Sequence, residues 1–133
     1  MAASKEDQRE LDRIAKICVN IAYVIHKKLG PGLLESAYLR IFLHELRKAG
    51  LKAATEVAVP LIWDGEDMGT AYRADLIVEG KLVIELKAVD NHPKLFARQL
   101  QTYLKLLDYR LGLVISFGLE TIAKGTERVA NNF

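Results

Sequence analysis

The stretch RADLIVEGKLVIELKAV, residues 73–89, is typical of two β-strands joined by a short turn. The second strand, 82–89, is almost entirely apolar, as expected for a strand that is buried on both faces. Glu85 and Lys87 nevertheless lie in its middle, and because side chains alternate along a strand, both leave the same face. A buried charge without a partner costs several kcal/mol. The two charges therefore require a partner, water or a metal ion.

Asp75, on the preceding strand, shares this face in only one of two registers. Directly opposed residues of an antiparallel hairpin lie on the same face, and positions 75 and 85 are opposed only when the loop has an odd number of residues centred on Gly80. A loop of Glu79, Gly80 and Lys81 meets this condition, whereas a two-residue loop would put Asp75 and Glu85 on opposite faces. We predict the three-residue loop. The alternative interpretation is a solvated face on which the charges form a surface salt bridge.

The rest of the chain predicts a mixed sheet flanked by helices, of α/β or α+β class, in the order α-α-β-β-β-α-β. Helical spacing of apolar residues covers about 7–29, 33–49 and 94–107, and strands are expected over 52–63, 69–78, 82–89 and 110–117. The three consecutive strands predict an antiparallel meander. The helix before the strand 110–117 allows a crossover, so that strand can pair in parallel. The tail closes with a short strand or turn.

Turn signals mark the ends of these elements. Gly30 is placed to end the first helix in a left-handed C-cap, and Pro31 cannot continue the helix. The DGED sequence, 64–67, predicts a turn between two strands, and Trp63 beside it is expected to pack within that hairpin.

The length and composition of the chain limit the classes of protein to which it can belong. The 133 residues fit one domain, 1–133, with residues 1–6 expected to be flexible, and half of them are hydrophobic. A net charge of +2 neither requires nor excludes binding to nucleic acid. Cys18 is the one cysteine, so a disulfide within the chain is excluded and a buried thiol is expected. No apolar run approaches the length of a membrane span, and we expect a soluble, cytoplasmic protein.

Three motifs together resemble a known family. Asp75, followed after nine residues by Glu85-Leu86-Lys87, resembles the D…(D/E)-x-K signature of the PD-(D/E)XK nuclease superfamily. The stretch GLLESAY, 32–38, is similar to the pattern of the bacterial GxxExxY family, a branch of that superfamily. The stretch QLQTY, 99–103, resembles a helix motif of several branches. Ala74 replaces the proline of the signature, at a variable position. The resemblance runs from about Ile14 to the C-terminus and implies a restriction-endonuclease-like fold.

The resemblance implies a metal-dependent nuclease that hydrolyses phosphodiester bonds in nucleic acid. Of the two kinds of nucleic acid, DNA is the expected substrate rather than RNA. Asp75 and Glu85 would bind Mg²⁺ or Mn²⁺, with the Leu86 carbonyl as a further ligand. A metal ion stabilises charge on the phosphorus centre and activates water, and Mg²⁺ takes hard oxygen ligands while keeping several waters. Lys87 would orient the attacking water or hold the phosphoryl oxygens.

Further site residues follow from the same motifs. Glu35 becomes a metal or water ligand supplied across the sheet, although an acid in the first helical turn is also favoured by the helix dipole. Tyr38 shares its face and is expected to steer Glu35 by packing. Gln99 would donate a hydrogen bond to a phosphate or support Lys87. Tyr103 lies one helical turn further on and is expected to pack in the core.

Other contacts and functions stay open. The weakest candidates for contact with the substrate are Arg73, Arg98 and Tyr103. The alternative to a nuclease is a catalytically silent nucleic-acid-binding or protein-interaction module of the same fold, and a small-molecule enzyme has no cofactor motif to support it. By analogy with small nucleases of this fold, a homodimer is possible, and no membrane partner is expected.

Overall fold

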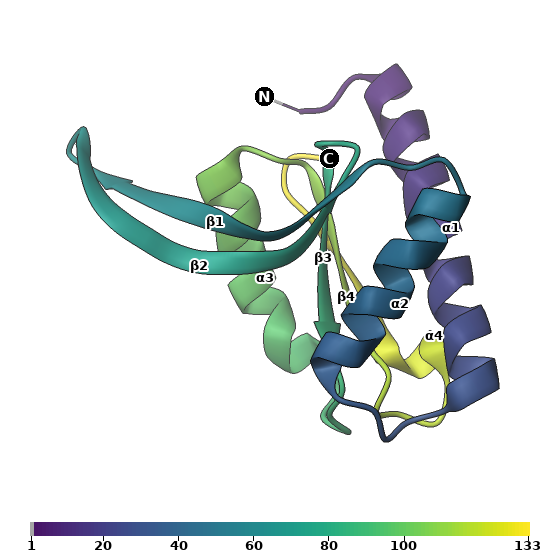
Figure 1. Ribbon diagram of the computed structural model, residues 1–133. Helices are drawn as coiled ribbons and strands as arrows, with labels where there is room; N and C mark the ends of the chain where they lie inside the picture. Colours follow the sequence, from purple (N-terminus) through teal and green to yellow (C-terminus); the bar gives the residue numbers. More distant parts are fainter. Residues whose placement is uncertain (1) are drawn as a thin grey trace.

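A five-stranded mixed sheet with helices on both faces organises residues 2–133, the part of the chain described by the computed structural model (Figure 1). The fold is of the α+β class, consistent with a restriction-endonuclease-like arrangement, and the predicted order of elements is confirmed. The elements are α1 (Lys5–Leu29), α2 (Glu35–Lys48), β1 (Ala53–Trp63), β2 (Glu66–Val78), β3 (Leu82–Lys87), α3 (Lys94–Leu107), β4 (Leu111–Ser116), α4 (Ile122–Gly125) and β5 (Thr126–Ala130).

The strands lie in chain order, β1-β2-β3-β4-β5. β1, β2 and β3 form the predicted antiparallel meander, and β4 pairs with β3 in parallel after the α3 crossover, also as predicted. The tail adds α4 and then β5, which pairs antiparallel with β4. Of the two expected forms of the tail, a short strand or a turn, the structure has the strand.

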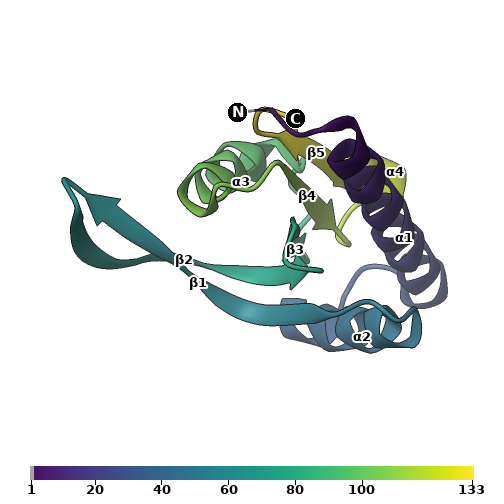
Figure 2. The ribbon, with the colours of Figure 1, turned by 90° about the horizontal axis from the view of Figure 1, so that it is seen from above.

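The helices divide between the two faces of the sheet. α1, α2 and α4 cover one face, and α3 covers the other (Figure 2). On the first face the Tyr38 ring stacks on Phe117, with centroids 4.2 Å apart. The expected burial of Cys18 among the apolar residues of α1 is confirmed. No helix within residues 2–133 is long and apolar enough to cross a bilayer.

The loop between β2 and β3 has the predicted register. Leu76 pairs with Ile84 and Val78 with Leu82, so the loop contains three residues, 79–81, centred on Gly80. Glu79 and Gly80 both adopt positive φ, 54° and 63°. This register opposes positions 75 and 85, as the shared-face hypothesis required.

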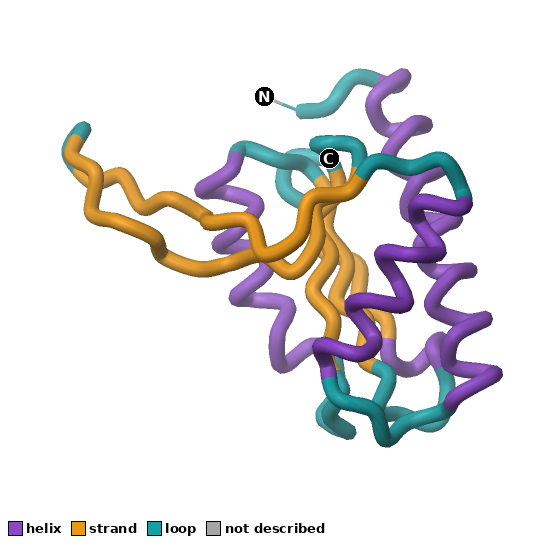
Figure 3. Tube along the Cα trace, viewed as in Figure 1, coloured by secondary structure: helices purple, strands orange, loops and turns teal. Residues whose placement is uncertain are grey.

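β1 and β2 continue beyond the rest of the sheet as a two-stranded arm, defined here as residues 60–70 (Figure 3). The turn is shorter than predicted: only Asp64 and Gly65 lie outside the strands, with φ values of 51° and 74°, typical of a type I′ hairpin turn. β2 therefore begins at Glu66 rather than near position 69. Trp63 is 66% exposed, so the expectation that it packs within the hairpin was wrong.

Several other element ends differ from their predicted positions. α1 begins at Lys5, earlier than expected, because the Ser4 hydroxyl accepts from the Asp7 amide at 3.1 Å and caps the helix. Residue 1 of the segment expected to be flexible lies outside the described residues. Gly30 has φ 65° and ψ −168°, a conformation that suits glycine but is not the predicted left-handed cap. α2 begins at Glu35 rather than position 33, and β3 ends at Lys87 rather than 89.

The end of β3 is held in place by a close backbone approach at Gly118. A Cβ atom built on Gly118 would lie 2.1 Å from the Val89 carbonyl oxygen, which also accepts a hydrogen bond from the Ser116 hydroxyl at 2.6 Å.

We expect Gly118→Ala to lower the free energy of unfolding by at least about 2 kcal/mol, because the backbone around Val89 must move to make room for the added methyl group. Gly112→Ala is the control: its Cβ would meet only the Leu100 side chain, at 2.9 Å. Urea unfolding of both variants checks this, and equal losses would contradict it.

Candidate active site

The site lies where β2 separates from β3. Backbone pairing between these strands runs from the loop to Leu76 and Ile84 and stops there. Beyond this point two side chains accept the hydrogen bonds of the backbone amides. The Asp75 amide donates to Glu85 Oε1 at 3.0 Å, and the Leu86 amide donates to Asp75 Oδ2 at 2.8 Å. The structure thus brings Asp75 and Glu85 together across the gap between the strands.

β1 is irregular at the same level of the sheet. Thr55 pairs with Leu76 and Val57 with Ala74, whereas Glu56, which this register opposes to Asp75, forms no regular pair. Glu56 has φ 49°, which is uncommon for a residue with a side chain. Both strands are therefore distorted at the site, where β1 and β2 curve away from β3 (Figure 2).

Burial makes the two central carboxyl groups hard to ionise. Glu85 is only 6% exposed. Burial raises its pKa to about 8, and the neighbouring charge of Asp75 contributes to this. The pKa of Asp75 is also raised, first by burial and then by the charges of Glu35 and Glu56. No Lys, Arg or His within residues 2–133 forms an ion pair with Asp75 or Glu85. Within the described chain, the carboxyl pair is thus not neutralised by a cationic side chain.

Lys87 supplies a positive charge on the α3 side of the sheet. Its ammonium group lies 4.6 Å from the centre of the Phe96 ring, a cation–π contact with α3. Its charge acts to lower the pKa of both Asp75 and Glu85, against the larger effect of burial. The prediction that Lys87 leaves the same face as Glu85 agrees with this position.

α3 presents the Gln99 motif to the same region. Gln99 is exposed and lies three residues after Phe96 and four before Tyr103, so all three share one helix face. Tyr103 is 4% exposed and packs against Tyr72 with ring centroids 4.7 Å apart. Burial raises the pKa of Tyr103, and the charges of the two site carboxylates add to the effect. Tyr103 is thus a packing residue beside the site.

Tyr38 fixes the loop from which Glu35 begins α2. The Tyr38 hydroxyl donates to the Gly30 carbonyl at 2.5 Å and accepts from the Leu33 amide at 3.3 Å. Because its ring is fully buried against Phe117, these bonds tie the loop to the core. This contact gives a physical basis for the prediction that Tyr38 steers Glu35.

A cavity of about 240 Å³ lies between α2 and the strands β1, β2 and β3. Its lining consists of Glu35, Ser36, Leu39, Glu56, Asp75 and Leu86. Glu56 was not identified from the sequence, because strand alternation grouped it only with Ala54 and Ala58. Its signal appears only once the register opposite Asp75 is known.

The donor set fits a hard divalent cation that keeps water ligands. Among residues 2–133, no three His, Cys, Asp or Glu side chains are close enough to form a metal site by themselves. Asp75 and Glu85 supply two carboxylates. The Leu86 amide points toward β2, and the carbonyl of a strand residue points to the same side as its amide. Two carboxylates, a carbonyl and water would suit Mg²⁺.

Two predicted substrate contacts remain apart from this cluster. Arg73 and Arg98 are exposed, and within the described chain no hydrogen bond or ion pair links their side chains to Asp75, Glu85 or Lys87. Their assignment stays a prediction.

Comparison with known proteins gives one match. The profile of the PD-(D/E)XK nuclease superfamily matches residues 12–129. This range contains every acidic residue of the site as well as Lys87 and Gln99. No curated protein and no solved structure matches the chain.

The raised pKa of Glu85 predicts a pH-dependent stability of the metal-free protein. With a pKa near 8 in the folded state and 4.5 as its ordinary value, folded Glu85 holds a proton that the unfolded chain releases. Stability should therefore be greatest below about pH 4.5 with respect to this group and fall as the pH rises to 8. Each pKa unit corresponds to about 1.4 kcal/mol, so the fall amounts to a few kcal/mol.

Urea unfolding in the presence of EDTA measures this dependence. Glu85→Gln should reduce the fall and be more stable than the native protein at the alkaline end. Glu66→Gln, at an exposed position on the arm, serves as the control. An unchanged pH dependence in Glu85→Gln would show that Glu85 is not the responsible group.

Proposed function

Because the chain belongs to the PD-(D/E)XK nuclease superfamily, we propose that it hydrolyses phosphodiester bonds with a divalent metal ion held by Asp75 and Glu85. The observation that carries this proposal is the carboxyl pair across the separated strands, with Glu85 buried, Asp75 half-buried and neither in an ion pair among residues 2–133. When both groups are ionised, such a pair is costly unless a cation is bound to it. Superfamily members generally use divalent ions, and we propose Mg²⁺ or Mn²⁺ here.

Each residue of the site has a role in this proposal. Asp75, Glu85 and the Leu86 carbonyl would hold the metal, which when bound stabilises negative charge on the phosphoryl group and activates water. Lys87 would hold the phosphoryl oxygens or orient the attacking water. Its contact with Phe96 limits the positions open to the ammonium group.

Glu35 and Gln99 would act from the two sides of the sheet. Glu35 lines the cavity that contains Asp75, and its charge acts on both central carboxyl groups. This supports a role in holding water or the metal. Gln99 shares the helix face of Phe96, which contacts Lys87, and this supports a role in donating a hydrogen bond to a phosphate oxygen or in supporting Lys87. Arg73 and Arg98 are proposed as outer contacts to the nucleic acid backbone.

Within the superfamily, we propose membership of the GxxExxY branch. Its three named positions correspond to Gly32, Glu35 and Tyr38, and the bonds from Tyr38 to the loop before α2 give the motif a physical role. DNA is the first substrate we would test, and a homodimer is the first assembly.

A cleavage assay tests the activity. Purified protein with Mg²⁺ or Mn²⁺ should cut plasmid, linear or single-stranded DNA, or RNA, and EDTA should abolish cutting. Glu85→Ala and Lys87→Ala should each reduce the rate by at least about 100-fold, because removal of one group that stabilises transition-state charge has effects of that size. Arg110→Ala, on the loop before β4, is a control. Activity unchanged in both site variants would refute the assignment, and metal-independent binding without cleavage would favour a silent binding module.

The Tyr38 hydroxyl offers a separate test of the Glu35 assignment. Tyr38→Phe keeps the ring stacked on Phe117 but removes the bonds to Gly30 and Leu33, which should cost about 1 kcal/mol of stability. If Glu35 acts in the site, the cleavage rate should fall in Tyr38→Phe at a temperature where the variant is fully folded, and Glu35→Gln should lower it further. An unchanged rate in both variants would remove Glu35 from the mechanism.

A further inference from the structure

The arm presents large apolar side chains to solvent. Ile62 is 54% exposed, Trp63 66% and Met68 54%. Trp63 is opposed by Glu66, and Met68 lies two residues further along β2, so Trp63 and Met68 share one face of the arm. An exposed apolar group that includes a tryptophan is typical of a binding surface.

Charge restricts the partner of this surface. The arm contains three acidic residues, Asp64, Glu66 and Asp67, and no basic residue between Pro60 and Thr70. Its tip would be repelled by phosphate and by the tip of a second arm. The partner should therefore combine an apolar recess with positive charge, which selects a protein surface over nucleic acid.

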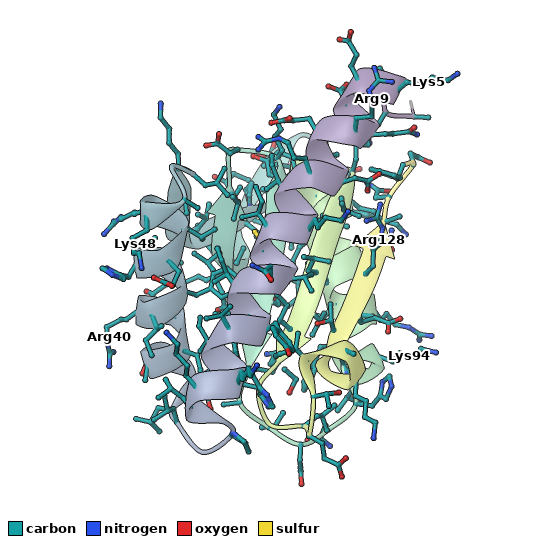
Figure 4. All side chains as sticks on the ribbon, turned by 90° about the vertical axis from the view of Figure 1, so that its right-hand side faces the viewer. Lys5, Arg9, Arg40, Lys48, Lys94 and Arg128 are labelled. Carbon is teal, nitrogen blue, oxygen red and sulfur yellow. The ribbon has the colours of Figure 1, made fainter. Side chains whose placement is uncertain are left out.

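A recess of this kind lies on the opposite side of the same chain. The α1–β5 groove has a volume of about 830 Å³, and its principal lining residues are Ala15, Lys16, Val19, Tyr23, Ile122 and Arg128. Its walls are mostly apolar, and it is large enough to accept a tryptophan side chain. Figure 4 shows the face on which α1 passes beside β5, with Arg128 labelled.

Positive charge lies along this groove. Lys16 is exposed and forms no ion pair within residues 2–133. Arg128 forms an ion pair with Asp12 at 2.6 Å, and Asp12 is the one acidic residue of the lining. Lys5 and Arg9 lie further along α1, toward its N-terminal end (Figure 4), where Glu6 and Asp7 balance their charge. The positive charge of the groove itself is therefore that of Lys16 and Arg128. The groove thus complements the acidic, apolar tip of the arm.

We propose that the arm of one copy of this chain inserts Trp63 into the α1–β5 groove of a second copy, with the acidic tip beside Lys16 and Arg128. The arm and the groove lie on opposite sides of the molecule, so a chain cannot fill its own groove (Figures 1 and 2). The contact joins two different surfaces, and such contacts close into a ring or extend into longer assemblies. The proposal does not depend on nuclease activity.

Sedimentation velocity and light scattering over concentrations up to the millimolar range test the assembly. The native chain should self-associate, and the association should weaken as salt increases. Trp63→Ser, in the arm, and Lys16→Glu with Ala123→Glu, in the groove, should each abolish it. All three positions are exposed, so folding should be retained, which circular dichroism checks. Lys105→Glu, an exposed charge reversal on α3, should leave association unchanged.

Mixing the two kinds of variant gives the decisive result. The Trp63→Ser chain retains its groove and the groove variant retains its arm, so an equimolar mixture should form a one-to-one complex although each variant alone is monomeric. Monomeric native protein at every concentration would overturn the proposal. Association that survives both variants, or a mixture that stays monomeric, would also overturn it.

Discussion

Two hydrogen bonds between side chain and backbone hold the site together where the sheet opens. The Asp75 amide and the Leu86 amide need acceptors once β2 leaves β3, and Glu85 and Asp75 respectively provide them. A buried amide without an acceptor costs about as much as a lost hydrogen bond. The carboxylates therefore satisfy the backbone at the separation point, and each keeps a second oxygen atom that these two bonds do not use. Structure and proposed chemistry depend on the same two groups.

The opening of the sheet also lets charges from its two sides act on the same carboxyl pair, since Glu35 and Lys87 both influence the pKa of Asp75 and of Glu85. α2 packs on one face and α3 on the other, so a continuous sheet would separate Glu35 from Lys87. Because β2 bends away at Asp75, the cavity lined by Glu35 reaches Asp75 and Leu86 of β3. Tyr38 sets the position of α2 and Phe96 contacts Lys87. The packing on each face therefore orients a different part of the site.

The sequence supported the fold because its signals were local and mutually consistent. Apolar spacing defined the helices, and the odd loop centred on Gly80 placed Asp75 opposite Glu85. Glu56 could not be found in the same way. Continued without interruption from the Asp64–Gly65 turn, the pairing of Trp63 with Glu66 would oppose Glu56 to Arg73. Two register shifts near Pro60 move its partner to Asp75 instead. A bulge shifts the register by one residue, and the sequence does not show how many bulges a strand contains. A proline in a strand is one sign of a bulge.

The exposure of Trp63 was missed for a related reason. A tryptophan beside a turn is expected to pack against its hairpin, but packing requires a helix or sheet layer over that part of the strands. Here α3 covers the base of the β1–β2 hairpin through Val59 and Ala74, and no helix or strand within residues 2–133 covers the tip. The length of the arm thus depends on where the neighbouring layer ends, which is a tertiary property. Since an apolar tip of this kind loses contact with water only by binding another surface, its composition is better explained by association than by folding of the single chain.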